Sequence, residues 1–150
     1  MAHAQDLNSR SPDERATIDG ACTKIMGLRQ GEAQYLDCQD SLAHSVARRD
    51  EAYAMAANAD DCRKRGLAPG PAALATCMLE GQGRGAAPAI QPAAYSSDMI
   101  EAGKGYFNVT PTVKFQRKRY ACAQIGLIPN SGLFGECVAS LEGALLSNPN

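Results

Sequence analysis

Apolar residues recur every three or four positions along most of the chain, which is the spacing of one face of an α-helix. The first such stretch places Ile18, Cys22 and Ile25 on a common face. It follows the segment from Ser11 to Glu14, which has the form of a capping box with proline at the first helical position and predicts a helix start. No run alternates apolar and polar residues as a half-buried strand does. The pattern therefore predicts an all-α fold.

The longest segment without glycine or proline runs from Glu32 to Arg65. As a single helix it would be about 50 Å long, and a break near residues 58–61 is the alternative. Further helices are predicted over 110–125 and from about residue 131. We expect an irregular helical bundle with one long central helix. The apolar stripe of that helix consists of Tyr35, Cys38, Leu42, Val46, Tyr53, Ala56 and Ala59.

A chain of 150 residues, 45% of them hydrophobic, suits one domain. We expect a single helical domain over 11–150, with a loop at about 81–95 where glycine, proline and alanine accumulate. Ala2 to Ala4, followed by Gln5, has the A-x-A form of a signal-peptidase site. Residues 1–10 are therefore interpreted as a signal remnant and flexible N-terminus, and an ordinary cytosolic start is the alternative. No stretch reaches the roughly 20 apolar residues of a transmembrane helix.

The cysteines form three neighbouring pairs, with fifteen, fourteen and fourteen residues between partners. An even number indicates a disulfide framework, although spacing alone leaves 15 connectivities open. Cys62 and Cys122 are each followed by Gly-Leu, then by proline and by glycine or asparagine before the next cysteine. This internal repeat favours pairing of neighbours, and the first pair is a divergent copy with one extra residue before its glycine and no proline. The six residues are Cys22, Cys38, Cys62, Cys77, Cys122 and Cys137.

The repeated pattern is typical of a helix end. In the last copy Gly126 suits the left-handed C′ position and Leu127 the following C″ position, which makes Cys122 the C3 residue of the preceding helix. Pro129 then prevents that helix from continuing, and Asn130 is predicted to cap the next one. Each copy therefore predicts a helix, a tight corner and a second helix joined by a disulfide, which contributes about 3 kcal/mol per bridge through loop closure.

Charge is balanced in total but uneven along the chain. Sixteen acidic and fifteen basic residues give a net charge of −1, which gives no reason to expect nucleic acid as a partner. Residues 1–61 hold eleven acidic and six basic residues, whereas 62–150 hold five and nine. The predicted helix over 110–125 carries a basic cluster of Lys114, Arg117, Lys118 and Arg119. This cluster, with the face around Phe115, Lys118 and Arg119, is interpreted as a docking surface for an acidic protein or an anionic headgroup. A solvated basic face is the alternative.

Residues suited to catalysis are scarce. The histidines are His3 and His44, and disulfide formation would leave no cysteine as a nucleophile. The chain has no phosphate-binding loop, nucleophile elbow or H-E-x-x-H sequence in a suitable context. We therefore expect a protein without catalytic residues or a cofactor.

A hard cation such as calcium is the alternative cofactor, because carboxylate oxygens are its preferred ligands. The candidate ligands are Asp37, Asp40, Asp60 and Asp61, provided that the fold brings them together. None of them has the spacing of a calcium-binding loop, and solvated helix faces are the competing interpretation.

The unit C-x3-G-L-x-P-[GN]-x6-C, present from Cys62 to Cys77 and from Cys122 to Cys137, resembles a motif of small exported proteins and lipoproteins of Gram-negative bacteria. The resemblance covers these two copies and loosely the first. It implies a periplasmic or envelope location and a disulfide-linked helical corner. It implies no catalytic residues, and the chain lacks the lipobox cysteine of the lipoprotein members.

The sequence thus predicts a periplasmic or secreted, non-catalytic accessory or adaptor protein that binds another envelope protein through a helical face. The alternative is a periplasmic carrier of a small ligand or of a hard cation, calcium-like or trivalent, held in the acidic half or in an alanine-lined cavity between helices. Neither nucleic acid nor a transmembrane segment is expected.

Overall fold

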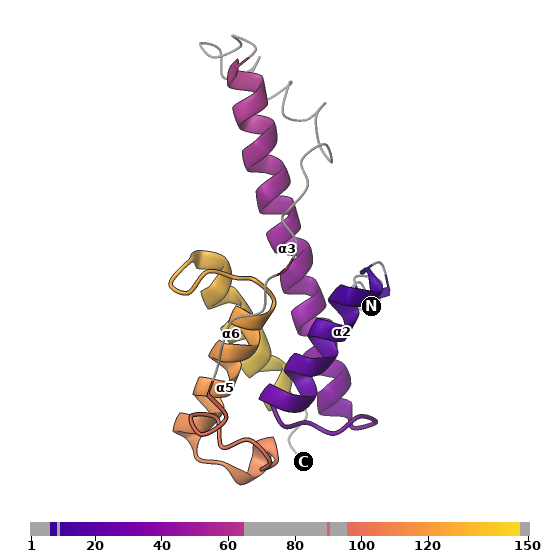
Figure 1. Cartoon of the computed structure of the whole chain (residues 1–150), viewed down its shortest axis with the longest axis vertical. Helices are drawn as coiled ribbons and strands as arrows, with labels where there is room; N and C mark the ends of the chain where they lie inside the picture. The colour runs from indigo at the N-terminus through magenta and orange to yellow at the C-terminus, as the bar shows by residue number, and fades with distance from the viewer. Residues whose placement is uncertain (1–6, 9, 65–89, 91–95, 148–150) are drawn as a thin grey trace. The chain divides into compact units, whose positions relative to one another are not determined.

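A computed structural model of the chain describes residues 7–8, 10–64, 90 and 96–147, apart from the side chains of residues 58, 59 and 61. The fold is all-α, as predicted, and these ranges contain no strand (Figure 1). The elements are α2 (Pro12–Gly20), the π-helix η1 (Ala21–Ile25), α3 (Ala33–Lys64), the 3₁₀-helix η2 (Tyr106–Asn108), α5 (Pro111–Gln124) and α6 (Gly132–Ser147).

The chain divides into two compact units. One comprises Met1–Val46 and Ile90–Asn150, and the other comprises Ala47–Ala89. Each unit is described by itself. That residues 11–150 form a single domain stays a prediction. The loop expected at about 81–95 lies outside the described residues, apart from Ile90.

The predicted capping box opens α2. The hydroxyl of Ser11 accepts a hydrogen bond from the Glu14 backbone N–H at 3.2 Å, and the Glu14 carboxylate accepts one from the Ser11 backbone N–H. These two bonds satisfy donors that the first helical turn leaves unpaired. Before this cap, Leu7 lies half-buried against the core of its unit.

The corner after α5 has the predicted helix-end geometry. Gly126 is left-handed, with φ of +90°. Its N–H donates to the Ala123 carbonyl at 3.0 Å, and the N–H of Leu127 donates to the Cys122 carbonyl at 3.4 Å. These are the two bonds of a Schellman motif, with Cys122 at C3. The sequence interpretation of this helix end is confirmed.

The corner after η1 accommodates its extra residue as a π-helix. The N–H of Met26 donates to the Ala21 carbonyl, five residues earlier, which is the spacing of a wider helical turn. One more residue therefore fits between Cys22 and the left-handed Gly27, whose φ is +75°. The N–H of Leu28 still donates to the Cys22 carbonyl, at 3.1 Å, as its counterpart does in the later corner.

The prediction that Asn130 caps α6 is wrong by one residue. Asn130 is left-handed, with φ of +70°, and the hydroxyl of Ser131 accepts the hydrogen bond from the Phe134 N–H at 3.2 Å. A cap residue needs extended backbone, which the left-handed Asn130 does not have. Gly31, with φ of +93°, occupies the corresponding place two residues before α3 begins.

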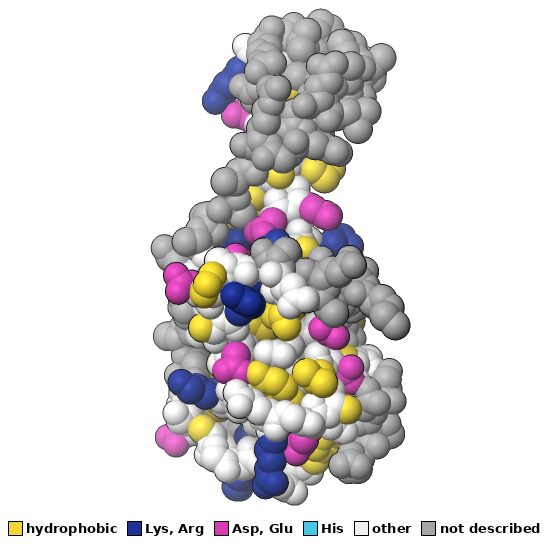
Figure 2. Space-filling view, turned by 90° about the vertical axis from the view of Figure 1, so that its right-hand side faces the viewer, with side chains coloured by type: hydrophobic (Ala, Val, Ile, Leu, Met, Phe, Trp, Pro, Cys, Tyr) yellow, Lys and Arg dark blue, Asp and Glu magenta, His cyan; other side chains and the backbone are white. Residues whose placement is uncertain are grey.

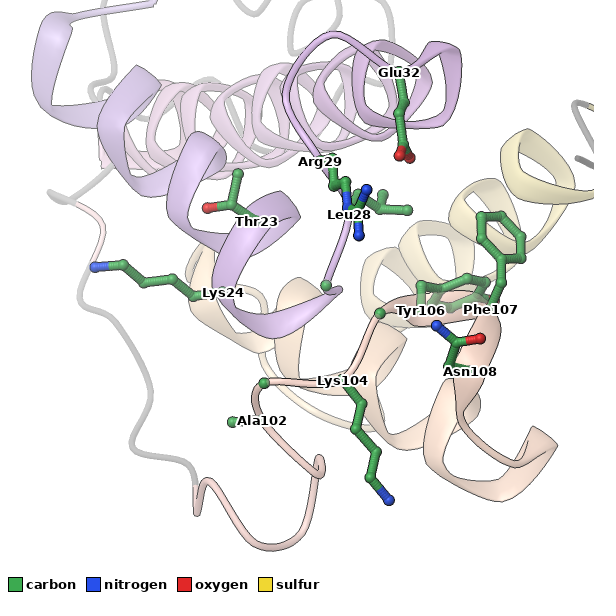
Figure 3. Close-up of a pocket in the computed structure, with 13 residues that line it drawn as sticks. Thr23, Lys24, Leu28, Arg29, Glu32, Ala102, Lys104, Tyr106, Phe107 and Asn108 are labelled. Carbon is green, nitrogen blue, oxygen red and sulfur yellow. The ribbon is translucent and has the colours of Figure 1, made fainter.

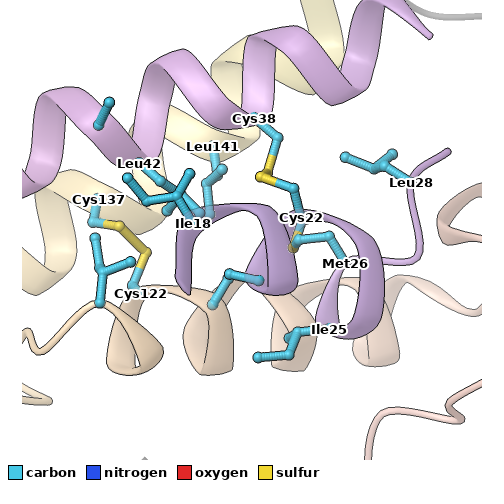
Figure 4. Packing of buried hydrophobic residues seen from close by; sticks show 14 of the residues in the cluster. Ile18, Cys22, Ile25, Met26, Leu28, Cys38, Leu42, Cys122, Cys137 and Leu141 are labelled. Carbon is cyan, nitrogen blue, oxygen red and sulfur yellow. A yellow bond between two sulfur atoms is a disulfide. The ribbon is translucent and has the colours of Figure 1, made fainter. Parts of the chain in front are cut away.

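Two disulfides connect the helices of these corners. Cys22 is bonded to Cys38, which joins η1 to α3, and Cys122 is bonded to Cys137, which joins α5 to α6 (Figure 4). The Cα atoms are 6.0 Å apart in both pairs, and both pairings agree with the neighbour scheme. Cys62 is disulfide-bonded as well, and its expected partner Cys77 lies outside the described residues.

The core of the first unit is built from α2, η1, the first part of α3, α5 and α6. Ile18, Leu42 and Leu141 come from three different helices, are fully buried and converge beside the disulfides (Figure 4). Burial of each such side chain contributes about 1.5–3 kcal/mol. Between α2 and α3, the Tyr35 hydroxyl donates to the Asp19 carboxylate and accepts from the Gln39 side chain at 2.8 Å.

The long helix α3 is continuous, so the alternative of a break near residues 58–61 is wrong. Its predicted apolar stripe faces the core only in the first part. Cys38, Leu42 and Val46 are fully buried, whereas Tyr53 and Ala56 are exposed. Within the described ranges, no helix is both long enough and apolar enough to cross a bilayer.

Candidate functional site

The basic helix α5 carries the residues that sequence analysis assigned to a docking surface. Thr110 caps it by accepting a hydrogen bond from the Val113 N–H at 3.3 Å, and Pro111 occupies its first position. Because successive residues of an α-helix are rotated by about 100°, neighbouring cations of α5 face different surroundings.

Arg117 lies inside the protein, with 1% of its surface exposed. Its guanidinium donates to four backbone carbonyl oxygens, those of Ile100, Met26, Glu101 and Lys104, at 2.7–3.0 Å. Burial lowers the pKa of Arg117, and the Glu101 carboxylate opposes that shift. A charged donor shared among carbonyls stabilises the buried cation. Arg117 therefore fastens the end of η1 and the turns of 100–104 to α5.

Gly27 makes this arrangement possible. A Cβ atom added to it would lie 2.4 Å from Arg117 Nη1 and 2.8 Å from the Lys104 carbonyl oxygen. The Gly27 carbonyl accepts a hydrogen bond from the Tyr106 N–H at 3.1 Å. The backbone at Gly27 is thus in close contact with the Arg117 guanidinium and with the backbone of residues 104–106. Position 27 therefore requires glycine, both because a Cβ atom would clash and because the backbone is left-handed.

The three residues predicted to bind a partner do not share one surface. Phe115 and Arg119 are exposed, whereas the side chain of Lys118 is only 9% exposed. Lys118 is turned toward Tyr106 and α6, where its ammonium lies 5.9 Å from the Tyr106 ring centroid and 3.9 Å from the Glu142 carboxylate. The placement of Lys118 on an exposed docking face is therefore corrected.

Phe115 and Arg119 form a patch, which we call the Phe115–Arg119 patch. The Arg119 guanidinium lies 5.9 Å from the Phe115 ring centroid and 5.7 Å from that of Phe134. Among the described residues Arg119 makes no hydrogen bond or ion pair. Both rings attract the cation through their π-electrons. The patch thus presents a cation held in position and the ring of Phe115, a residue that is 47% exposed.

Sequence analysis placed Lys114 in the basic cluster of this helix but missed Tyr106 and Phe107. The Lys114 ammonium lies 5.4 Å from the Tyr106 ring centroid and 5.8 Å from that of Phe107. A signal existed, because Lys114 and Lys118 are one turn apart and fall on the same side of α5 as the buried Ala121. Two lysines on the core-facing side of a helix indicate a neighbouring group that receives them, and η2 supplies it.

A pocket of about 540 Å³ lies between the corner after η1 and η2 (Figure 3). Glu32 and Arg29 extend into it from one side, and Tyr106, Phe107 and Asn108 line the other, while Lys104 points away. The lining is mainly polar and charged, and so differs from the alanine-lined cavity that was one option for the alternative carrier function. Its volume is in the range of small-molecule sites.

The four predicted metal ligands are not brought together as a group in the part of the chain that is described. Asp37 and Asp40 are half-buried on α3. Asp60 forms an ion pair with Lys64 at 3.0 Å, and the Asp61 side chain lies outside the described residues. Among the described side chains, no three His, Cys, Asp or Glu residues form a group that could hold a metal ion.

Acidic and basic side chains are interspersed around exposed hydrophobic ones on the face shown in Figure 2. The uneven charge of the two sequence halves therefore does not produce a face of one sign there. Local arrangements such as the Phe115–Arg119 patch, rather than the total charge, distinguish one part of the surface from another.

Comparison of the chain with protein-family models, with curated proteins and with solved structures found no match.

Proposed function

We propose that this protein is a non-catalytic accessory protein of the periplasm that binds another envelope protein through the Phe115–Arg119 patch. Disulfides persist in oxidising compartments such as the periplasm, and the bonded pairs Cys22–Cys38 and Cys122–Cys137 support such a location.

The observation that carries the proposal is the position of the Arg119 guanidinium over two aromatic rings. Arginine and aromatic residues are enriched at protein interfaces and contribute much of the binding energy there. A guanidinium already held over Phe115 and Phe134 loses little side-chain entropy on binding. Its donors are available to a carboxylate or carbonyl of a partner, because among the described residues none of them is used.

The disulfides also support a binding role for a rigid surface. Cys122–Cys137 joins α5 to α6 at the turn that follows the patch, and Phe134 and Cys137 lie on consecutive turns of α6. A crosslink at this position restricts movement of α6 relative to α5. A patch built across two crosslinked helices keeps its geometry in the free protein, which favours affinity through preorganisation.

The test is capture of a stoichiometric partner from an envelope extract by the tagged, oxidised protein. The double variant Phe115→Ala/Arg119→Ala is expected to lose the partner, since truncation of two interface anchors costs about 2 kcal/mol or more. The control Leu36→Ala/Arg15→Ala removes one exposed apolar side chain from α3 and one exposed cationic side chain from α2. Retention of the partner by the first variant, or its loss by the control, would contradict the proposal.

A small-ligand carrier is the second candidate, and the pocket beside η2 is the observation that favours it. Arg29 and Glu32 place opposite charges in this pocket (Figure 3), an arrangement that suits a small polar molecule with both donor and acceptor groups. Calorimetry with a panel of free amino acids tests it. Saturable binding that Glu32→Gln abolishes would favour the carrier, and absence of binding would remove it.

A further inference from the structure

Two lysines of α5 converge on one aromatic ring. The ammonium groups of Lys114 and Lys118 lie 5.4 and 5.9 Å from the centroid of Tyr106. Burial lowers the pKa of Lys118, and the nearby Lys114 lowers it further, against the effect of Glu142. Two like charges this close destabilise each other unless an anion lies between or beside them.

The polar atoms at this place are incompletely paired. The side chain of Lys118 is 9% exposed, and its ammonium is 3.9 Å from the nearest Glu142 carboxylate oxygen, which is longer than a hydrogen bond. Tyr106 is 5% exposed, and among the described residues its hydroxyl makes no hydrogen bond. Neither the Lys118 ammonium nor the Tyr106 hydroxyl is among the described polar atoms that are buried without a partner, so both reach solvent and can donate to an external acceptor.

We propose that Lys114, Lys118 and the Tyr106 hydroxyl form a carboxylate-binding site that receives an acidic side chain of a protein partner. The proposal deepens the function inferred above, on which it depends for the source of the carboxylate. Electrostatic complementarity supports it, because the site offers two cations and a hydroxyl donor to an anion. Phe107 adds an apolar surface for the rest of the partner's chain. It is 42% exposed, and its ring centroid lies 5.8 Å from the Lys114 ammonium.

Glu142 shows that a carboxylate fits this place. Its side chain is 56% exposed, comes from α6, and acts electrostatically on both Lys118 and Tyr106. Its long distance to Lys118 leaves that ammonium without a close acceptor. An incoming carboxylate would compete with Glu142 for the same cation. Loss of the Glu142 charge should therefore strengthen binding, whereas loss of the Lys118 charge should weaken it.

The experiment measures binding of a tetraglutamate peptide, acetylated and amidated at its ends, to the full oxidised chain by calorimetry at low salt. Lys118→Gln is expected to weaken binding at least about tenfold, as for loss of a charge-assisted hydrogen bond. Tyr106→Phe removes only the hydroxyl and should weaken binding about threefold or more. Glu142→Gln should strengthen it by a similar factor.

Lys104→Gln is the matched control, because Lys104 is an exposed lysine already paired with Glu101 at 2.9 Å. It removes one positive charge from the same unit and should leave the affinity within about twofold, as an exposed pair contributes little. Equal weakening by Lys104→Gln and Lys118→Gln would show a general charge effect and overturn the proposal. So would absence of saturable binding, or weaker binding by Glu142→Gln.

Inorganic phosphate and vesicles of anionic phospholipid serve as further probes. Lys118-dependent binding of either one, without binding of tetraglutamate, would overturn the assignment of a carboxylate from a protein. If Lys118→Gln fails to fold, Tyr106→Phe and Glu142→Gln decide, because they keep the packing and change opposite partners. If the protein binds tetraglutamate but captures no partner from envelope extract, the proposed partner function is refuted and the carboxylate-binding site stands. If it captures a partner but does not bind tetraglutamate, only the proposed site is refuted.

Discussion

Gly27→Ala should strongly destabilise the fold, and Gly31→Ala is the matched substitution with which it can be compared. At Gly27 the backbone is left-handed, with φ of +75°, and a Cβ atom would lie 2.4 Å from Arg117 Nη1 and 2.8 Å from the Lys104 carbonyl oxygen. Gly31 is also left-handed, with φ of +93°, but a Cβ atom there meets nothing within 4 Å. The two substitutions share the conformational cost and differ in the steric cost.

The conformational cost of alanine in a left-handed position is about 1–2 kcal/mol, and alanine recovers about 0.4–1 kcal/mol by restricting the unfolded chain. Gly31→Ala should therefore lower the free energy of unfolding by about 1 kcal/mol. Gly27→Ala must in addition displace Arg117, whose Nη1 donates to the Met26 carbonyl. Loss of that charged hydrogen bond adds about 1.5–3 kcal/mol, so the total is about 2.5–4 kcal/mol.

The assay is urea denaturation of the oxidised variants, with thermal unfolding as a second measure. In a chain of this size, each kcal/mol shifts Tm by roughly 2–4 °C. Gly27→Ala should thus melt at least about 3 °C below Gly31→Ala. If the two variants agree within about 0.5 kcal/mol, a difference too small for a displaced buried cation, the close approach at Gly27 has no energetic consequence and the reasoning is refuted.

Three further predictions concern stability. Arg117→Met keeps an extended side chain but leaves four carbonyls without their donor, and should cost about 3 kcal/mol or more in urea denaturation. Removal of the Cys122–Cys137 disulfide by a double serine substitution should cost about 3 kcal/mol, because the crosslink closes a short loop in the unfolded chain. Burial raises the pKa of Tyr35 to about 12, with Asp19 adding to the shift. Since tyrosine in an unfolded chain ionises near pH 10, the stabilising contribution of neutral Tyr35 is complete below that pH and is lost as the pH rises from about 10 to about 12.

Each of these has a control. Arg119→Met changes the same residue type on the surface and should cost about 0.5 kcal/mol or less; an equal effect of both arginine variants would contradict the role of Arg117. The double serine variant should keep its helical circular dichroism, and full stability after the loss of the bridge would contradict the loop-closure argument. For Tyr35, urea denaturation at pH 9–11 is compared with Tyr35→Phe, which removes the ionisable hydroxyl. The same loss of stability in both proteins would assign the pH dependence to other groups.

Local chemistry made the corners predictable. A glycine followed by leucine after a run of helix formers has few conformations available, so that Gly126 and Leu127 indicated the helix end and the position of Cys122 within it. The one-residue error at Asn130 arose because asparagine both caps helices and tolerates a left-handed backbone, and sequence alone does not rank these two uses. The π-helix at η1 follows from the extra residue before Gly27, once the distance between the helices is fixed by Cys22 and Cys38.

The surroundings of the α5 cations could not be predicted in the same way. Their burial depends on residues 100–107, which are remote in sequence and have no periodic pattern to place them. Arg117 and Lys118 were therefore grouped with Arg119 as surface charges, which is the usual position of a basic residue. The sequence was enough to predict that these residues point in different directions from the helix. It was not enough to predict the backbone carbonyls that contact Arg117 or the Tyr106 ring that contacts Lys118.

The three consecutive cations of α5 thus link stability to recognition. Arg117 holds the Glu101 and Lys104 carbonyls, Lys118 lies beside the Tyr106 ring that follows them, and Arg119 remains at the surface with Phe115. Because the turns of 100–104 lead directly into η2, loosening them should move Tyr106 more than it moves Phe115. Arg117→Met should accordingly weaken tetraglutamate binding, measured below the unfolding temperature, more than it weakens capture of the partner through the Phe115–Arg119 patch. Equal loss of both activities would mean that α5 responds as a whole, and that the two surfaces are not independent.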